Sequence, residues 1–134
     1  MPLPPTNPSM AVTEGLRVVV ESRYLPEQSD ARARRYVWAY TVEVHNESEH
    51  RWQLLSRHWV ITDADGDVEE VRGPGVIGQQ PVLAPGEGFR YTSGCALQTP
   101  SGSMHGSYRM TRPDGTELDI DIAPFSLRQP ATLN

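Results

Sequence analysis

The sequence contains no lysine and only one cysteine, Cys95, among its 134 residues. A single cysteine cannot form an intramolecular disulfide, which favours a reducing compartment over secretion. No apolar run approaches the roughly 20 residues that cross a bilayer. The segment 1–10 holds four prolines and no basic or long apolar stretch, so it does not resemble a signal peptide. We therefore expect a cytoplasmic protein that is not associated with a membrane.

All twelve basic residues are arginines, and the formal net charge is −5. A genome rich in arginine codons is the simplest explanation of this bias, and bidentate recognition of anions by guanidinium groups is the alternative. Net acidity argues against a general nucleic-acid-binding protein, which needs a basic surface. The densest basic cluster, Arg32, Arg34 and Arg35, lies close to Asp30 in the sequence and is expected to be a solvated loop.

Apolar residues recur mainly with a period of two, which is typical of half-buried β-strands. The clearest case is the segment 36–46, where Trp38, Tyr40 and Val42 fall on one side and Thr41 on the other. Helix is expected only as a turn or two near 28–34. Turn-forming residues separate seven expected strands, at 16–23, 36–46, 52–62, 68–71, 89–97, 103–111 and 116–127. Seven short strands with regular turns predict an all-β antiparallel sandwich.

A chain of this length fits one domain. Residues 1–12 and 128–134 contain proline and polar residues, and we expect both segments to be flexible tails. The folded domain is then expected to span residues 13–127.

The turn between the last two expected strands predicts their register. Pro113-Asp114-Gly115 suits a three-residue hairpin loop, with glycine in the left-handed position. Such a loop places Met110 opposite Leu118 and Tyr108 opposite Ile120, so that every inward partner is apolar.

The preceding turn predicts a second hairpin. A four-residue loop over 99–102 would pair Leu97 with Met104 and Cys95 with Gly106. The large apolar side chains of the two strands would then share one core face: Phe89, Tyr91, Cys95, Leu97, Met104, Tyr108 and Met110.

Cys95 and His105 are the one candidate nucleophile–base pair. The second hairpin would place them on opposite faces, so Cys95 is expected to be a small buried hydrophobic residue. We predict no catalytic residues.

The sharpest local motif is Gly73-Pro74-Gly75-Val76-Ile77-Gly78, a literal G-x-G-x-x-G. In dinucleotide-binding folds this motif opens a helix, but here only two residues separate Gly78 from Pro81. We therefore expect a tight connection between strands. The alternative is an anion-binding concavity of backbone amides with nearby guanidinium groups; its candidate residues are Arg57, Arg72, Gly73, Gly75 and Gly78.

Two further clusters invite a metal-site interpretation. Asp63, Asp65 and Asp67 lack the glycine position, the glutamate and the helices of an EF-hand, so we interpret them as a turn. His45 and His50 would face each other if the intervening residues closed a hairpin, and could then hold a transition metal loosely. Surface histidines are the simpler interpretation, and we predict no resident metal and no cofactor.

Five stretches of the sequence together resemble the ApaG family over about residues 16–127: Gln53–Trp59, Glu69–Pro81, Tyr91–Cys95, Gly102–Tyr108 and Pro124–Phe125. The resemblance implies an immunoglobulin/fibronectin type III-like sandwich and a small cytoplasmic bacterial protein. It also implies an association with cobalt resistance and magnesium efflux. Related domains occur in eukaryotic F-box and polymerase-interacting proteins, which suggests a module that binds other proteins.

Three functional classes remain after these exclusions. The first is a non-enzymatic module that binds another protein, present as a monomer or weak homodimer. The second is a sensor of a small anion, such as pyrophosphate or a nucleotide, that uses the glycine-rich loop 73–78. An enzyme is the third, and it has least support because no acid–base groups converge in the sequence pattern.

Overall fold

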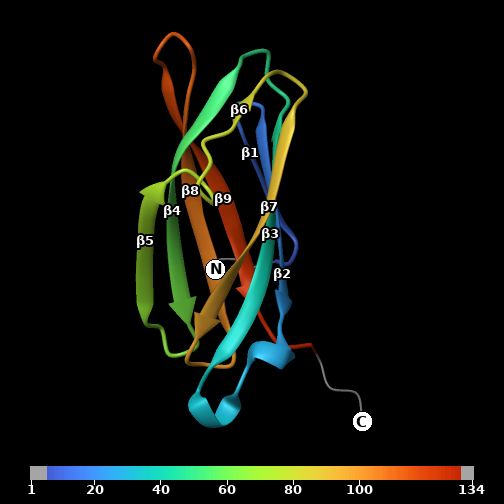
Figure 1. Ribbon diagram of the computed structural model, residues 1–134, viewed down its shortest axis with the longest axis vertical. Helices are drawn as coiled ribbons and strands as arrows, with labels where there is room; N and C mark the ends of the chain where they lie inside the picture. The colour runs from blue at the N-terminus through green and yellow to red at the C-terminus, as the bar shows by residue number, and fades with distance from the viewer. Residues whose placement is uncertain (1–5, 131–134) are drawn as a thin grey trace, which may run out of the picture.

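Two antiparallel sheets pack face to face, as the period-two patterning predicts (Figure 1). The computed structural model describes residues 6–130. Sheet I has the strand order β1(Ser9–Thr13), β2(Leu16–Tyr24), β3(Tyr36–Asn46), β7(Gly88–Leu97). Sheet II has the order β5(Val68–Pro74), β4(Trp52–Asp63), β8(Gly102–Thr111), β9(Glu117–Leu127), and β6(Val82–Leu83) pairs with the start of β4. The architecture is the predicted immunoglobulin/fibronectin type III-like sandwich.

The expected helical turns near 28–34 are two short 3₁₀ turns, Pro26–Gln28 and Ala31–Ala33. Asp30 caps the second turn, because its side chain accepts a hydrogen bond from the backbone amide of Arg32 at 3.0 Å. These turns connect β2 to β3 and position no candidate site residue.

An aromatic cluster fills the space between the sheets. The ring of Trp59 (β4) lies 5.2 Å from that of Tyr40 (β3), 5.9 Å from that of Phe125 (β9) and 6.2 Å from that of Tyr108 (β8), all in edge-to-face geometry. Such pairs contribute about 0.5–1.5 kcal/mol each beyond the burial of their surface. The core therefore depends on large rings contributed by both sheets.

The expected N-terminal tail is partly a strand. Ser9–Thr13 forms β1, which pairs with β2 along its whole length, so the sheet begins before residue 13. At the other end the carbonyl oxygen of Arg128 accepts a hydrogen bond from the indole nitrogen of buried Trp38 at 2.8 Å. The parts of the expected tails at 1–5 and 131–134 lie outside the described residues.

The hairpin expected at 99–102 was wrong. β7 pairs with β3 in sheet I and β8 pairs with β4 and β9 in sheet II, so the segment after Leu97 crosses between sheets. Cys95 lies opposite Trp38, and Gly106 lies opposite Trp59. The error has a simple cause: strands that face each other across a core show the same apolar alternation as strands that are paired.

The hairpin between β3 and β4 that would make His45 and His50 face each other does not form. These strands belong to different sheets, and His45 pairs with Arg17 and Gly88. His50 is exposed in the connection that follows β3.

The register predicted for the last hairpin is confirmed. Met110 lies opposite Leu118 and Tyr108 opposite Ile120. Gly115 has φ +87° and donates its amide to the carbonyl oxygen of Arg112 at 2.9 Å. The loop chemistry of 113–115 therefore sets which residues of β8 and β9 face the core.

The two sides of the sandwich differ. On the side that we call the closed flank, β1 and β2 lie against β9: the Ser22 hydroxyl donates to the carbonyl oxygen of Ser126 at 2.6 Å, and the Ser9 hydroxyl donates to that of Ala123 at 3.0 Å. The opposite side, which we call the open flank, is bounded by β5 and β7. Within residues 6–130 no hydrogen bond joins these two strands.

In the described part of the chain, no helix is both long and apolar enough to span a bilayer.

The buried hydroxyls of Tyr91 and Tyr108 make a hydrogen bond between the sheets and provide a test of the core. Replacing either tyrosine with phenylalanine leaves the other hydroxyl without this partner, which should lower the free energy of unfolding by about 1–3 kcal/mol. We expect the double variant to lose less than the sum of the single losses, as measured by urea denaturation. Tyr24→Phe is the control, and strictly additive losses would contradict the assignment.

Candidate functional site

The glycine-rich loop 73–78 turns the chain at the end of β5 without starting a helix, as expected. Val76 and Gln79 exchange backbone hydrogen bonds of 2.8 and 2.9 Å, which closes a tight turn. Gly75 and Gly78 have φ values of +57° and +73°, a region that side chains disfavour. A Cβ on Gly75 would also lie 2.2 Å from the carbonyl oxygen of Gln79. The loop geometry therefore requires both glycines.

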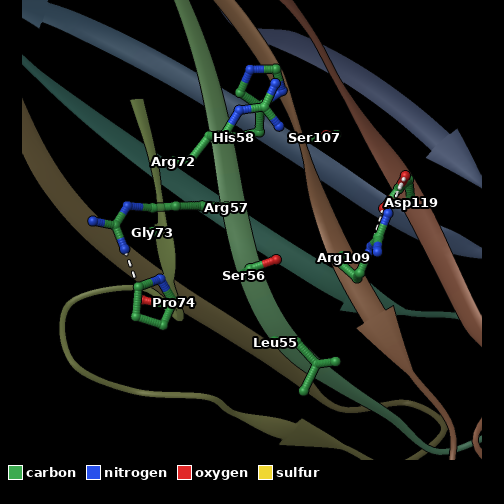
Figure 2. A pocket seen from close by; sticks show the side chains of 10 residues that line it. All are labelled: Leu55, Ser56, Arg57, His58, Arg72, Gly73, Pro74, Ser107, Arg109 and Asp119. Carbon is green, nitrogen blue, oxygen red and sulfur yellow. Dashed lines mark hydrogen bonds and ion pairs between the residues drawn. The ribbon is translucent and has the colours of Figure 1, made fainter. Parts of the chain in front are cut away.

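Arg57 holds this loop in place from β4. Its Nη1 atom donates to the carbonyl oxygens of Pro74 at 2.8 Å and Gly75 at 2.9 Å, and Figure 2 shows its side chain directed at Pro74. A Cβ on Gly73 would lie 2.9 Å from Nη2 of Arg57. Gly73 therefore makes room for the guanidinium group.

Only some of the backbone amides of the loop are occupied by hydrogen bonds within the protein. Gly75 donates to the carbonyl oxygen of Leu55 at 2.8 Å, and the amides of Val76 and Gln79 bond within the turn. The amides of Ile77 and Gly78 have no partner among the described residues, so an anion here would be held by these two amides together with nearby side chains.

A pocket of about 590 Å³ lies beside the loop, on the outer face of sheet II (Figure 2). Three of the five candidate anion-binding residues line it: Arg57, Arg72 and Gly73. Gly75 is buried and Gly78 is exposed, and neither is a lining residue.

Other basic and hydroxyl side chains line the same pocket: His58, Arg109, Ser56 and Ser107. The Nε2 atom of His58 lies 2.8 Å from a carboxylate oxygen of Glu70. Arg109 bonds Asp119 at 3.0 Å and lowers the pKa of that carboxyl group below its usual value. Glu70 also lies 3.7 Å from Arg72, whose side chain is 72% exposed. The most accessible positive charge at the pocket therefore belongs to Arg72.

The sequence pattern alone did not reveal His58 and Arg109 as pocket residues, although a signal existed. The register that the loop 113–115 sets between β8 and β9 pairs Arg109 with Asp119. The turn at Asp65-Gly66 likewise pairs His58 with Arg72. Both pairs follow from loop chemistry once the strands are known.

Cys95 and His105 do not come together. Cys95 lies on the inner side of β7 and is half-buried, whereas His105 is exposed on β8 of the other sheet. Burial, together with the negative charge of Glu69, raises the pKa of the Cys95 thiol to about 11. The thiol is therefore protonated at neutral pH and packs as a small apolar group.

The aspartate cluster forms the expected turn. Carboxylate oxygens of Asp63, Asp65 and Asp67 lie within 4.8 Å of one another. The Asp63 carboxylate accepts the backbone amides of Asp65 at 2.9 Å and Asp67 at 3.0 Å, as in an Asx-turn. The first of these side chains therefore already has partners within the turn.

The open flank holds two shallow cavities between the sheets. One, of about 310 Å³, lies among Tyr40, Trp59, Val71 and Cys95. The other, of about 400 Å³, is lined by apolar residues and by three carboxylates; its lining residues are Ile61, Asp63, Asp67, Val68, Glu69, Ala96, Leu97 and Gln98. Val68 is 61% exposed there. The core thus reaches the surface on this side, and acidic groups lie at one end of the opening.

The thiol pKa can be checked by alkylation. Because the pKa of the Cys95 thiol rises from 9.0 to about 11, the folded protein has roughly a hundredfold less thiolate at pH 8 than an unperturbed thiol would have. Iodoacetamide should therefore modify Cys95 slowly at pH 8, at a rate that still rises beyond pH 10, as followed by mass spectrometry. The protein unfolded in urea is the control and should react at the ordinary rate. A rate that levels off near pH 9 in the folded protein would contradict this environment.

Comparisons with known proteins agree with the sequence and the fold. The model of the ApaG domain family matches residues 26–112. Protein ApaG of Anaeromyxobacter dehalogenans is 55% identical over 126 residues, which are 94% of this chain and 99% of that protein. Protein ApaG of Methylobacillus flagellatus is 55% identical over 117 residues, covering 87% of this chain and 92% of that protein. The crystal structure of an ApaA protein from Bordetella pertussis has a TM-score of 0.84 at 50% identity and covers 96% of this chain and all of that chain. The chain belongs to the ApaG family.

Proposed function

We propose that this protein is a non-enzymatic binding module that engages another protein through its open flank. The observation that carries the proposal is the asymmetry of the sandwich. The closed flank has hydrogen bonds between the sheets, whereas β5 and β7 have none between them within residues 6–130.

The surface chemistry of the open flank supports a protein partner. Ile61, Val71 and Cys95 pack against the core but are only partly buried, and Val68 is exposed beside them. Unpaired strand edges beside apolar side chains are a common place for another polypeptide to bind, and monomeric proteins usually protect them. A partner that covered this side would bury both.

The ionisable groups of the core support a non-catalytic role. Burial raises the pKa of Tyr40, Tyr91 and Tyr108, so these hydroxyls are protonated at neutral pH. A protonated Cys95 without a nearby histidine base is a poor nucleophile.

We further propose that the protein acts in the cytoplasm and that any link to cobalt resistance or magnesium efflux operates through its protein partner. A lone cysteine suits a reducing compartment. An aspartate cluster whose first member accepts backbone amides does not require an ion to be stable.

Site-specific photo-crosslinking tests the module in living cells. A benzophenone amino acid at Ala96, on the open flank, should give a discrete adduct with one protein, detected by gel shift and identified by mass spectrometry. The same amino acid at Thr116, exposed in the turn between β8 and β9, is the matched control and should give none. Equal adducts at both positions, or no adduct at Ala96, would contradict the proposal.

A second candidate function is the binding of a small phosphate-containing anion in the pocket beside the glycine-rich loop. The specific observation in its favour is that Arg57, Arg72 and Gly73 line one pocket together with Arg109. Guanidinium groups suit phosphate oxygens because they can bind two of them at once.

Titration with pyrophosphate and ATP, with and without magnesium, tests this second function. The backbone amide signals of residues 56–58, 72–73 and 107–109 should shift and saturate. Arg72→Gln should weaken binding at least about fivefold because a charge-assisted contact is lost, whereas Arg90→Gln, on the other sheet, should leave it unchanged. Unchanged spectra at matched ionic strength would remove the anion site.

A further inference from the structure

The register of β7 shows which of its backbone groups are free. Asn46 is the last residue of β3, and Glu87 immediately precedes β7. The backbone amide of Asn46 donates to the carbonyl oxygen of Glu87 at 2.9 Å. In an antiparallel ladder the bonded pairs then recur at every second residue, so the odd-numbered residues of β7 bond to β3. The amides and carbonyls of Thr92, Gly94 and Ala96 consequently point away from β3, along the open flank.

The free edge of β5 is different in character. Gly75 bonds Leu55, so by the same alternation the free positions of β5 are Val68, Glu70, Arg72 and Pro74. Two of these carry charged side chains and Pro74 has no amide hydrogen, which are devices that protect strand edges from pairing. The free positions in the second half of β7 carry only small side chains and have no such protection.

Gly94 lies in the middle of this unprotected edge, and neither the backbone conformation nor the packing at this position requires a glycine. A Cβ at each of Gly73, Gly88, Gly102 and Gly106, the other strand glycines of the described chain, would come within 3.0 Å of another atom. A Cβ on Gly94 would meet only the carbonyl oxygen of Trp38 at 3.7 Å, an ordinary contact, and its φ is not left-handed. Glycine within a strand often marks the close approach of another group, and large aromatic side chains on a neighbouring strand can cover such a position.

Charge along the open flank sets the chemistry of an occupant. Asp63, Asp67 and Glu69 line the cavity near Ala96, and none of these carboxylates has an ion-pair partner among residues 6–130. A lysine or arginine of a bound segment would complement them. The neighbouring cavity beside Val71 is lined by Arg57 and Glu69 as well as by apolar side chains, and an aliphatic side chain would fit its apolar part.

We infer that the free edge of β7 binds an extended segment of a partner protein, which adds to sheet I as a further strand. Its backbone pairs with Thr92, Gly94 and Ala96. On the outer face a large or aromatic side chain covers Gly94; on the inner side an aliphatic residue and a basic residue face the open flank. This inference rests on the proposed function and specifies its partner as a basic, alternating β-strand peptide.

A displayed library of random 12-residue peptides, selected on the full chain, provides the test. Recovered peptides should combine alternating apolar or aromatic residues with lysine or arginine, and should slow hydrogen exchange at the amides of Thr92, Gly94 and Ala96. Glu69→Gln should weaken their binding several-fold.

Two matched proline variants locate the edge. Gly94→Pro removes a free amide of β7 and no hydrogen bond to β3, and should weaken peptide binding at least tenfold. Glu70→Pro makes the same change on the edge of β5 and should alter it less than twofold. If Gly94→Pro does not fold, Gly94→Val, which fills the space over the strand, should weaken binding several-fold with no loss of melting temperature.

Each contrary outcome has a distinct meaning. Protection of amides on β5, or full binding by Gly94→Pro, would overturn the β7 assignment and leave the binding module standing. Failure to select any peptide, with no adduct from the Ala96 crosslinker, would overturn both. Concentration-dependent protection of β7 without peptide, with a dimer in sedimentation, would show that the occupant is a second copy of the chain and would overturn the partner segment.

Discussion

The aromatic layer between the sheets sets the distance on which the rest of the molecule depends. Trp59 packs edge-to-face with Tyr40 and Phe125, so the sheets stand about 10 Å apart, as in other sandwiches. Paired strands lie only about 4.8 Å apart. The backbones of the outermost strands β5 and β7 therefore cannot bond to each other across the core, and only side chains could close this flank.

The closed flank shows how the same gap is bridged elsewhere. There the side chains of Ser9 and Ser22 donate hydrogen bonds to carbonyl oxygens of β9. Hydroxyl groups thus join the two sheets where backbone hydrogen bonds between strands are absent. No comparable polar bridge joins β5 to β7 within the described residues, and the carboxylates of Glu69 and Asp67 lie where such a bridge could form. The difference between the two sides is therefore one of side-chain chemistry rather than of topology.

Local patterns in the sequence predicted the strands well and their pairing only in part. Alternation located β3 and β4, and the loop at 113–115 determined the register of β8 and β9. The partner of β7 could not be predicted, because alternation marks the inward face without saying which strand lies beside it. Arg72 and Gly73 could be identified as site candidates because they are neighbours in the sequence at the glycine-rich motif. His58 and Arg109 lie on other strands and reach the same pocket only through cross-strand pairing. Strand β1 was missed because it follows a proline-containing segment.

The glycines of this ApaG protein show how a structural motif is separated from a functional one. Each glycine of the conspicuous G-x-G-x-x-G loop has an internal cause: Gly73 makes room for Arg57, and the turn after β5 requires Gly75 and Gly78. Once folding explains a residue, its presence says little about a ligand. Gly94 belongs to no conspicuous motif, and folding explains neither its missing side chain nor its place on an unprotected edge. The residue that the fold does not need is therefore the stronger indication of an external partner.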